Sequence, residues 1–283
     1  MSRRRRTRAH GGRSLLWLGL IVVMVGAVGL ALAWDRVDRD EPAAPAAAPV
    51  EPAQRLLVRE GLRREDVAEV LEAETTMSGE RYLALTAPGP RGRRLAGADR
   101  PTSLEGFLFP ATYESTDATT AQELVDQQVA AYQAAEAQVD YRYARSRNLT
   151  RFDVLILASM IEREVQVPRE RRIVAGVMYN RLRLGMRLDI DATVQYAIGE
   201  WTPELTRSDL ETDSPYNTRR YPGLPPGPIC SPGLDAIRAA ARPAQHDLIY
   251  YVAKNDGTGG HYFSSSAEQF EADVARSRAN AGG

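Results

Sequence analysis

A single long apolar segment, FDVLILASMIEREV at residues 152–165, stands in the interior of this 283-residue sequence. Thr150 and Asp153 form a capping-box pattern at its start, which predicts a helix that begins beside Thr150. Apolar residues occupy almost every side of this helix, and a helix of that kind is buried in the middle of a domain. The rest of the fold must therefore be built around it.

Glu162 is the unusual residue of this helix. On a helical wheel at about 100° per residue it falls within about 40° of Leu155 and Ala158, whereas Glu164 points roughly 160° away. A carboxyl partly sunk among aliphatic side chains has its charged form disfavoured, as a general acid requires. The alternative is that Glu162 pairs with a buried arginine and only supports packing, and the wheel does not separate the two.

Weaker patterns on either side of the central helix predict an α+β fold that is mostly helical. Residues 105–114, with two Phe and a Tyr around Pro110, suit a short extended segment on the surface, and residues 86–103 suit a loop. Asp191 is a candidate N-cap. The expected elements are a strand at 55–59, helices at 63–74, 120–139, 171–184, 191–198, 231–241 and from 265, and an antiparallel hairpin of 248–253 with 261–264 around the turn NDGTGG.

The N-terminus differs from the rest of the chain. Residues 1–14 contain six arginines and no acid, and residues 15–34 contain no charged side chain. About 20 apolar residues span a bilayer core, and basic residues before such a segment stay on the cytoplasmic side. We expect a single-pass anchor at the plasma membrane, with the N-terminus cytoplasmic and the body outside. The alternative is a signal peptide cut near Ala31-Leu32-Ala33.

Charge and composition exclude several classes of protein. Beyond the first 14 residues, which hold six of the 36 basic residues, 30 basic residues stand against 37 acidic ones, so a nucleic-acid partner is not expected. The lone cysteine, Cys230, excludes an intramolecular disulfide framework and a multi-thiolate metal site. Three histidines leave little material for a zinc site. A metal site built from thiolates or histidines is therefore not expected.

Two further features are candidates for ligand contacts. The runs SPYNTR (214–219) and GLPPGP (223–228) form a rigid, irregular loop in which Tyr216 and Asn217 place an aromatic ring beside an amide, the groups that commonly hold sugars. The alternative is a turn-rich connector. His261 begins the strand after the glycine-rich turn, and a lone histidine there is more often structural than catalytic.

Eight segments, in this order, resemble the endolytic murein transglycosylases of the YceG-like (MltG) family. They cover most of residues 101–275, and together they are a specific signal although none is decisive alone. The segments are 104–114 (LEGFLFPATYE), 157–164 (LASMIERE), 174–188 (VAGVMYNRLRLGMRL), 191–198 (DATVQYAI), 214–218 (SPYNT), 223–229 (GLPPGPI), 231–241 and 260–264 (GHYFS).

The resemblance implies a membrane-tethered lytic transglycosylase that cuts the MurNAc–GlcNAc β-1,4 bond inside nascent peptidoglycan strands and leaves 1,6-anhydro-MurNAc ends. The catalytic glutamate of the family falls on Glu162, acting as the sole general acid and base. Inner-membrane cell-wall synthases are the implied partners, and the resemblance implies no metal and no organic cofactor. The residues expected to contact the glycan are Tyr216, Asn217, Gln195, Glu105 and His261.

The resemblance also implies a division of the chain. Only the last portion of the family's LysM-like region is present, near residues 56–74, and an Ala/Pro-rich linker replaces the rest. Two other functions remain open: a non-catalytic peptidoglycan-binding scaffold of the elongation machinery, and a hydrolytic muramidase with Asp191 or Glu105 as second carboxylate. The expected parts are a basic head (1–14), a transmembrane helix (15–34), a linker (35–54), a partial LysM-like subdomain (55–100) and a catalytic domain (101–283).

Overall fold

A computed structural model describes residues 53–99, 102–202 and 204–282, which fall within one compact unit, residues 51–283. The predicted basic head and transmembrane helix lie outside the described residues, as does nearly all of the predicted linker. Among the described residues, no helix is both long enough and apolar enough to cross a bilayer.

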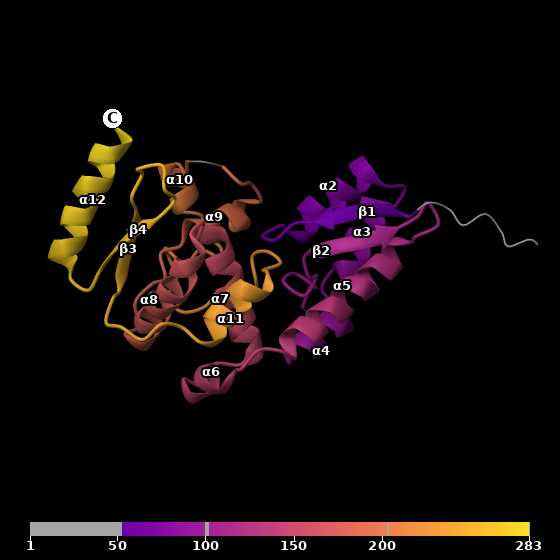
Figure 1. Ribbon diagram of the computed structural model, residues 1–283, viewed down its shortest axis with the longest axis horizontal. Coiled ribbons are helices and arrows are strands. Elements are labelled where there is room, and N and C mark those ends of the chain that lie inside the picture. Colours follow the sequence, from indigo (N-terminus) through magenta and orange to yellow (C-terminus); the bar gives the residue numbers. More distant parts are fainter. Residues whose placement is uncertain (1–52, 100–101, 203, 283) are drawn as a thin grey trace, which may run out of the picture. The chain divides into compact units, whose positions relative to one another are not determined.

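The described part is mixed α+β, and it is mostly helical (Figure 1). Two short antiparallel sheets accompany the helices. In chain order the elements are β1 (Gln54–Val58), α2 (Arg64–Glu74), α3 (Gly79–Thr86), α4 (Pro90–Ala96), β2 (Ala111–Ser115), α5 (Ala121–Glu136), α6 (Arg142–Ser146), α7 (Arg151–Glu164), η1 (Pro168–Glu170), α8 (Arg171–Arg183), α9 (Asp191–Ile198), α10 (Arg207–Leu210), α11 (Leu234–Ala241), β3 (Tyr250–Ala253), β4 (His261–Ser264) and α12 (Ala267–Ala281).

The first of two hydrophobic cores lies between the β1–β2 sheet and helices α2, α3 and α5. The strands pair antiparallel, with Leu56 opposite Tyr113. The surface placement expected for residues 105–114 is wrong, because Phe107 and Leu108 are fully buried. The loop expected at 86–103 contains α4. Residues on both sides of position 100 share this core, and the predicted domain division there stays a prediction.

Helix α7 forms the centre of the second core, as its apolar sequence predicts. Every residue from Val154 to Ile161 is buried, and α11, α8 and α9 pack against the helix. The predicted capping box is present, since the Thr150 hydroxyl accepts a hydrogen bond from the backbone N–H of Asp153, and the Asp153 carboxylate accepts one from the backbone N–H of Thr150. The polar side chains that follow this buried stretch, including Glu162, lie in the C-terminal turn of α7.

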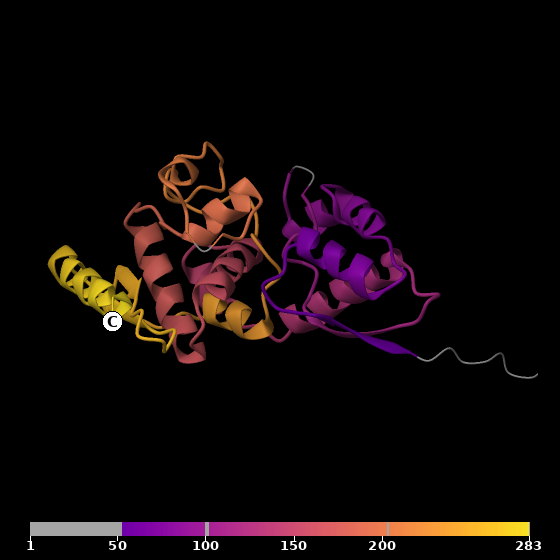
Figure 2. The same ribbon diagram turned by 90° about the horizontal axis from the view of Figure 1, so that it is seen from above.

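The predicted hairpin is confirmed. Strands β3 and β4 pair antiparallel, with Ala253 opposite His261. The turn between them needs backbone in the left-handed region, and Asn255 at φ 52° and Gly257 at φ 78° supply it. Helix α12 packs along both strands, as the two views show (Figure 1, Figure 2).

Two predicted helix starts need correction. Ile190, not Asp191, is the N-cap of α9, and the Asp191 carboxylate instead forms a salt bridge with Arg219. Helix α11 begins after Gly233 rather than at Ser231, because the backbone N–H and C=O of Ser231 are bonded to the turn between β1 and α2. Both differences come from long-range contacts that local patterns do not contain.

Candidate active site

Glu162 lies in the last turn of α7 with its side chain only 7% exposed. Its Oε1 accepts a hydrogen bond from the Arg171 guanidinium at 3.2 Å, and its Oε2 accepts one from the backbone N–H of Gly233 at 3.0 Å. The arginine partner that the packing alternative requires is therefore present. These two donors fix the carboxylate in one orientation, which a catalytic acid also needs.

A second carboxylate, Glu60, shares the Arg171 guanidinium at 4.0 Å. It belongs to the turn between β1 and α2, and about half of its side chain is exposed. Partial burial raises the pKa of Glu60, and the nearby charge of Glu162 adds to this shift. Sequence reasoning missed Glu60, because 102 residues separate it from Glu162 and no local pattern links them.

Gly233 makes the approach of Glu60 possible. A Cβ at position 233 would lie 1.9 Å from Oε1 of Glu60, closer than any real contact. The backbone of Gly233 has φ −73°, an ordinary value, so the close approach rather than the backbone angle requires glycine. The N-terminus of α11 therefore faces two carboxylates, Glu60 and Glu162.

Backbone hydrogen bonds hold the three segments of this site together. The N–H of Gly61 donates to the carbonyl of Ser231 at 2.9 Å, and the N–H of Ser231 donates to the carbonyl of Leu62 at 2.9 Å. The Arg163 guanidinium donates to the carbonyl of Gly61 at 3.3 Å and lies 3.9 Å from the centroid of the Trp201 ring. The turn that carries Glu60 is thus tied to both α7 and the segment before α11.

Glu164 is a further carboxyl on the same helix, and it is half-buried. It accepts a hydrogen bond from the Tyr251 hydroxyl at 3.0 Å, and burial raises its pKa to about 7. The wheel places Glu164 away from the apolar arc of α7, but β3, which carries Tyr251, covers that side. A pKa of this value suits a general acid, so Glu164 is the rival of Glu162 for that role.

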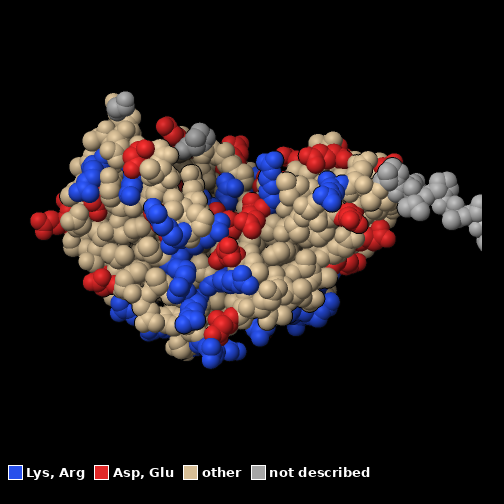
Figure 3. Space-filling model, viewed as in Figure 1, with Lys and Arg blue, Asp and Glu red and all other residues tan. Residues whose placement is uncertain are grey.

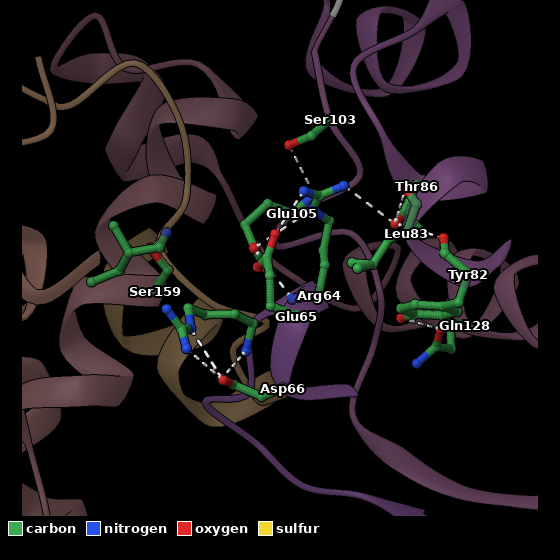
Figure 4. A network of polar contacts seen from close by, with 12 residues as sticks. Arg64, Glu65, Asp66, Tyr82, Leu83, Thr86, Ser103, Glu105, Gln128 and Ser159 are labelled. Atoms are coloured by element: carbon green, nitrogen blue, oxygen red, sulfur yellow. Dashed lines mark hydrogen bonds and ion pairs between the residues drawn. The ribbon is translucent and has the colours of Figure 1, made fainter. Parts of the chain in front are cut away.

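Glu105 is also buried, with a relative exposure of 2%. The backbone N–H of Arg64 donates to its Oε2 at 3.3 Å, and the Nε of Arg64 lies 3.9 Å away, while Oε1 has no hydrogen-bond partner among the described residues (Figure 4). Burial raises the pKa of Glu105 to about 8. Glycan contact by Glu105 and its use as a second carboxylate stay predictions.

Glu105→Gln is expected to flatten the loss of stability at rising pH. The folded protein binds a proton on Glu105 up to about pH 8, whereas an unfolded chain loses it near the ordinary value of 4.5. The contribution of Glu105 to the free energy of unfolding is therefore fully present below pH 4.5 and is lost between pH 4.5 and about pH 8. The loss from this one group is about 1.4 kcal/mol per pH unit. Urea unfolding of both proteins between these limits measures the difference. Parallel pH profiles would contradict the assignment.

The other three candidates for glycan contact are Asn217, Gln195 and Tyr216. Asn217 is fully buried, and its amide donates to the carbonyls of Leu210 and Thr212, so it holds the loop together, and its glycan contact stays a prediction. The amide of Gln195 donates to the carbonyl of Thr202. Tyr216 is half-buried, with its ring 4.7 Å from that of Tyr196. Glycan contact by Tyr216 and Gln195 stays a prediction.

His261 fits the structural alternative. Its Nδ1 lies 2.8 Å from a carboxylate oxygen of Glu170, and its backbone N–H donates to the same carboxylate. Its side chain is 8% exposed and packs edge-on against Tyr251. Glu170 therefore connects the start of β4 to the segment before α8, and glycan contact by His261 stays a prediction. No group of three potential metal ligands occurs within residues 53–99, 102–202 and 204–282.

Comparison with known proteins shows the family of the chain. The model of the YceG-like family matches residues 41–276. A protein from Streptococcus pneumoniae (strain ATCC BAA-255 / R6) named endolytic murein transglycosylase is 37% identical over 178 residues, which is 61% of this chain and 32% of that protein. A Bacillus subtilis (strain 168) protein of the same name is 37% identical over 154 residues, 54% of this chain and 43% of that protein.

A solved structure agrees with these matches. The crystal structure of a YceG-like protein from Listeria monocytogenes superposes with a TM-score of 0.66 and 34% identity, over 79% of this chain and 76% of that one. The chain spans about a third of the length of the Streptococcus relative and less than half of the Bacillus relative. With a family model that matches 41–276 and a related structure of the same fold, the chain belongs to the YceG-like family.

Proposed function

We propose that the protein is a lytic transglycosylase that cuts glycan strands of peptidoglycan internally, between MurNAc and GlcNAc. The observation that carries the proposal is the placement of Glu162, fixed by Arg171 and the N–H of Gly233 at the end of the central buried helix. The names of the Streptococcus and Bacillus relatives support the same reaction. The resemblance of the 157–164 segment to the family assigns the catalytic role to Glu162 rather than Glu164.

One carboxyl group is enough for this reaction. Glu162 as an acid protonates the glycosidic oxygen, and the bond from that oxygen to C1 of MurNAc breaks. Glu162 as a carboxylate then takes the proton of the C6 hydroxyl while O6 bonds to C1, which gives the 1,6-anhydro end and restores the acid. Arg171 and Gly233 hold the carboxylate in place through both steps. The substrate supplies its own nucleophile, so the two-carboxylate scheme of glycoside hydrolases is not required.

The position of Glu60 beside Glu162 supports a second candidate function, that of a hydrolytic muramidase. Such an enzyme needs a second carboxylate to activate water. Glu105 is buried, and Asp191 is paired with Arg219, but Glu60 shares Arg171 with Glu162. The two reactions leave different ends, because hydrolysis gives a reducing MurNAc that is heavier than the anhydro form by one water.

Two variants of the Glu60 contact separate the candidates. In the lytic reaction, Glu60→Gln is expected to lower cleavage by less than about tenfold and to leave the anhydro ends unchanged, because Glu60 transfers no proton. Gly233→Ala displaces the Glu60 carboxylate without changing its charge. It should likewise lower cleavage by less than about tenfold and leave the anhydro ends unchanged. Cleavage assays with mass analysis of the ends measure both. A loss of about 10²-fold or more in Glu60→Gln, with reducing ends in the unsubstituted protein, would favour hydrolysis.

A direct assay tests the proposal against a silent scaffold. The full chain in detergent is incubated with purified glycan strands, and strand length is followed by chromatography. The proposed enzyme shortens the strands from within, whereas a scaffold binds them and leaves their length unchanged. Unchanged strand length with clear binding would contradict the proposed function.

The place of action is part of the proposal. We infer that residues 15–34 anchor the protein in the plasma membrane with the N-terminus cytoplasmic, which would place the catalytic residues outside the membrane near the synthases that make new strands. The arginine-rich residues 1–14 support this orientation. Protease protection of tags at the two ends of the chain in intact cells tests it.

A further inference from the structure

An arginine-lined pocket adjoins the proposed catalytic site. It encloses about 330 Å³ between the start of α8 and helix α11, and its charged lining consists of Arg171, Arg172, Arg238, Arg242 and Asp235. Basic side chains gather in the lower middle of the surface in Figure 3, where Figure 1 places α11. Arg171 is already paired with Glu162 and Glu60, and Arg238 is paired with Asp235. The guanidinium groups of Arg172 and Arg242 form no salt bridge with a described residue, so they supply the positive charge for a small anionic group in this space.

The arginines of the pocket keep donors available for a ligand. Asp235 forms a salt bridge with Arg238 at 3.6 Å, and both side chains are largely exposed. Arg172 uses its Nε to bond the carbonyl of Arg242, whose own guanidinium makes no salt bridge with a described residue. The Nε of Arg171 is buried and has no hydrogen-bond partner in the described part of the chain. Arg172, Arg242 and the Nε of Arg171 therefore keep donors that no described carboxylate uses.

Arg171 connects the pocket to the proposed catalytic site, because the same guanidinium that lines the pocket donates to Glu162. An anion bound in the pocket and the Glu162 carboxyl, which acts on the glycosidic bond of MurNAc, would then contact the same arginine side chain. In peptidoglycan, that sugar carries a short peptide on its lactyl group, and the peptide bears free carboxylates. Arginine binds carboxylates through its planar fork of donors.

We propose that this pocket binds the carboxylates of the stem peptide on the MurNAc residue being cut. The inference rests on the proposed function, since it takes peptidoglycan as the substrate. It makes the enzyme selective for strands that carry peptides over stripped strands. Asp235 competes with the ligand for Arg238, so its removal strengthens binding.

Equilibrium binding of three strand preparations tests the pocket: strands with intact stems, the same strands with their stem carboxylates amidated, and strands stripped of peptide by an amidase. The protein is the full chain carrying Glu162→Gln, so that no strand is cut. We expect intact strands to bind about tenfold more tightly than amidated strands. Adding R238Q and R242Q should reduce this preference to less than about twofold and leave binding of stripped strands unchanged. Adding D235N should increase the preference.

The matched control replaces two exposed arginines outside the pocket, R207Q and R276Q, which removes the same charge. This control should keep the preference for intact strands. Equal binding of intact and amidated strands overturns the proposal. So does an equal loss on intact and stripped strands in the R238Q/R242Q protein, because the ligand would then be the lactyl group or the sugar.

Cleavage by the unsubstituted protein separates this proposal from the proposed reaction. A protein that shows the arginine-dependent preference but cuts no strand supports the pocket and contradicts the reaction alone. A protein that cuts all three preparations at one rate and binds them equally contradicts the pocket alone.

Discussion

Glu162→Gln is expected to lower the rate of glycan cleavage by about 10³-fold and to leave the fold intact. Glutamine keeps the shape of the side chain and can still accept hydrogen bonds from Arg171 and the N–H of Gly233. It cannot donate a proton to the glycosidic oxygen or take one from the C6 hydroxyl, and general acid and base catalysis contributes about 10²–10⁴-fold. Initial rates on purified glycan strands measure the loss, with circular dichroism as the check on folding.

Glu164→Gln is the matched control, because Glu164 lies on the same helix and, like Glu162, is only partly exposed. Its contacts are with Tyr251, not with Arg171, so its replacement should change the rate by less than about tenfold. It removes a group whose pKa is raised to about 7, and it should therefore flatten the fall of stability with pH above 4.5. A large loss of activity in Glu164→Gln with little loss in Glu162→Gln would reverse the assignment.

Arg181→Ala is expected to destabilise the protein by about 3 kcal/mol, a drop in Tm of roughly 6–12 °C. Arg181 is buried in α8 and joins three parts of the second core. Its guanidinium donates to the carbonyl of Ile249 at 2.7 Å and to the carbonyl of Leu188 at 2.6 Å, and it pairs with Asp189 at 3.6 Å. Alanine would leave two carbonyls without their charged donor. Thermal and urea unfolding measure the effect.

Arg183→Ala is the control for this prediction. Arg183 lies two residues further along α8, where its side chain is exposed. It makes no salt bridge or hydrogen bond with another described residue, so its replacement should change stability by less than about 0.5 kcal/mol. Equal losses of stability in the two variants would show that the buried hydrogen bonds of Arg181 do not stabilise the fold.

Local sequence patterns predicted the helices and the hairpin that are formed by contacts between residues close together in the sequence. The apolar run of α7 and its capping box predicted a buried helix, and the turn NDGTGG predicted the β3–β4 hairpin. Pairing of β1 with β2 was not predictable, because more than 50 residues separate the strands. The burial of Phe107 was missed for the same reason, since residues distant in the sequence cover it.

The candidate site was predicted only where one helix defines it. The wheel of α7 singled out Glu162, which indeed lies at the edge of the buried face. Glu60 joins the site through a turn from the other core, and a wheel of α7 also contains no information on β3, which covers Glu164. Composition also does not distinguish an amide that holds a loop, as that of Asn217 does, from one that binds a sugar.

The mass of the newly formed MurNAc ends tests the central claim most directly. Purified sacculi are digested with the full chain in detergent, and the muropeptides are then analysed by mass spectrometry. The account predicts 1,6-anhydro ends, lighter than reducing ends by one water, which disappear with Glu162→Gln. Reducing ends alone, or anhydro ends that persist undiminished in Glu162→Gln, would contradict it.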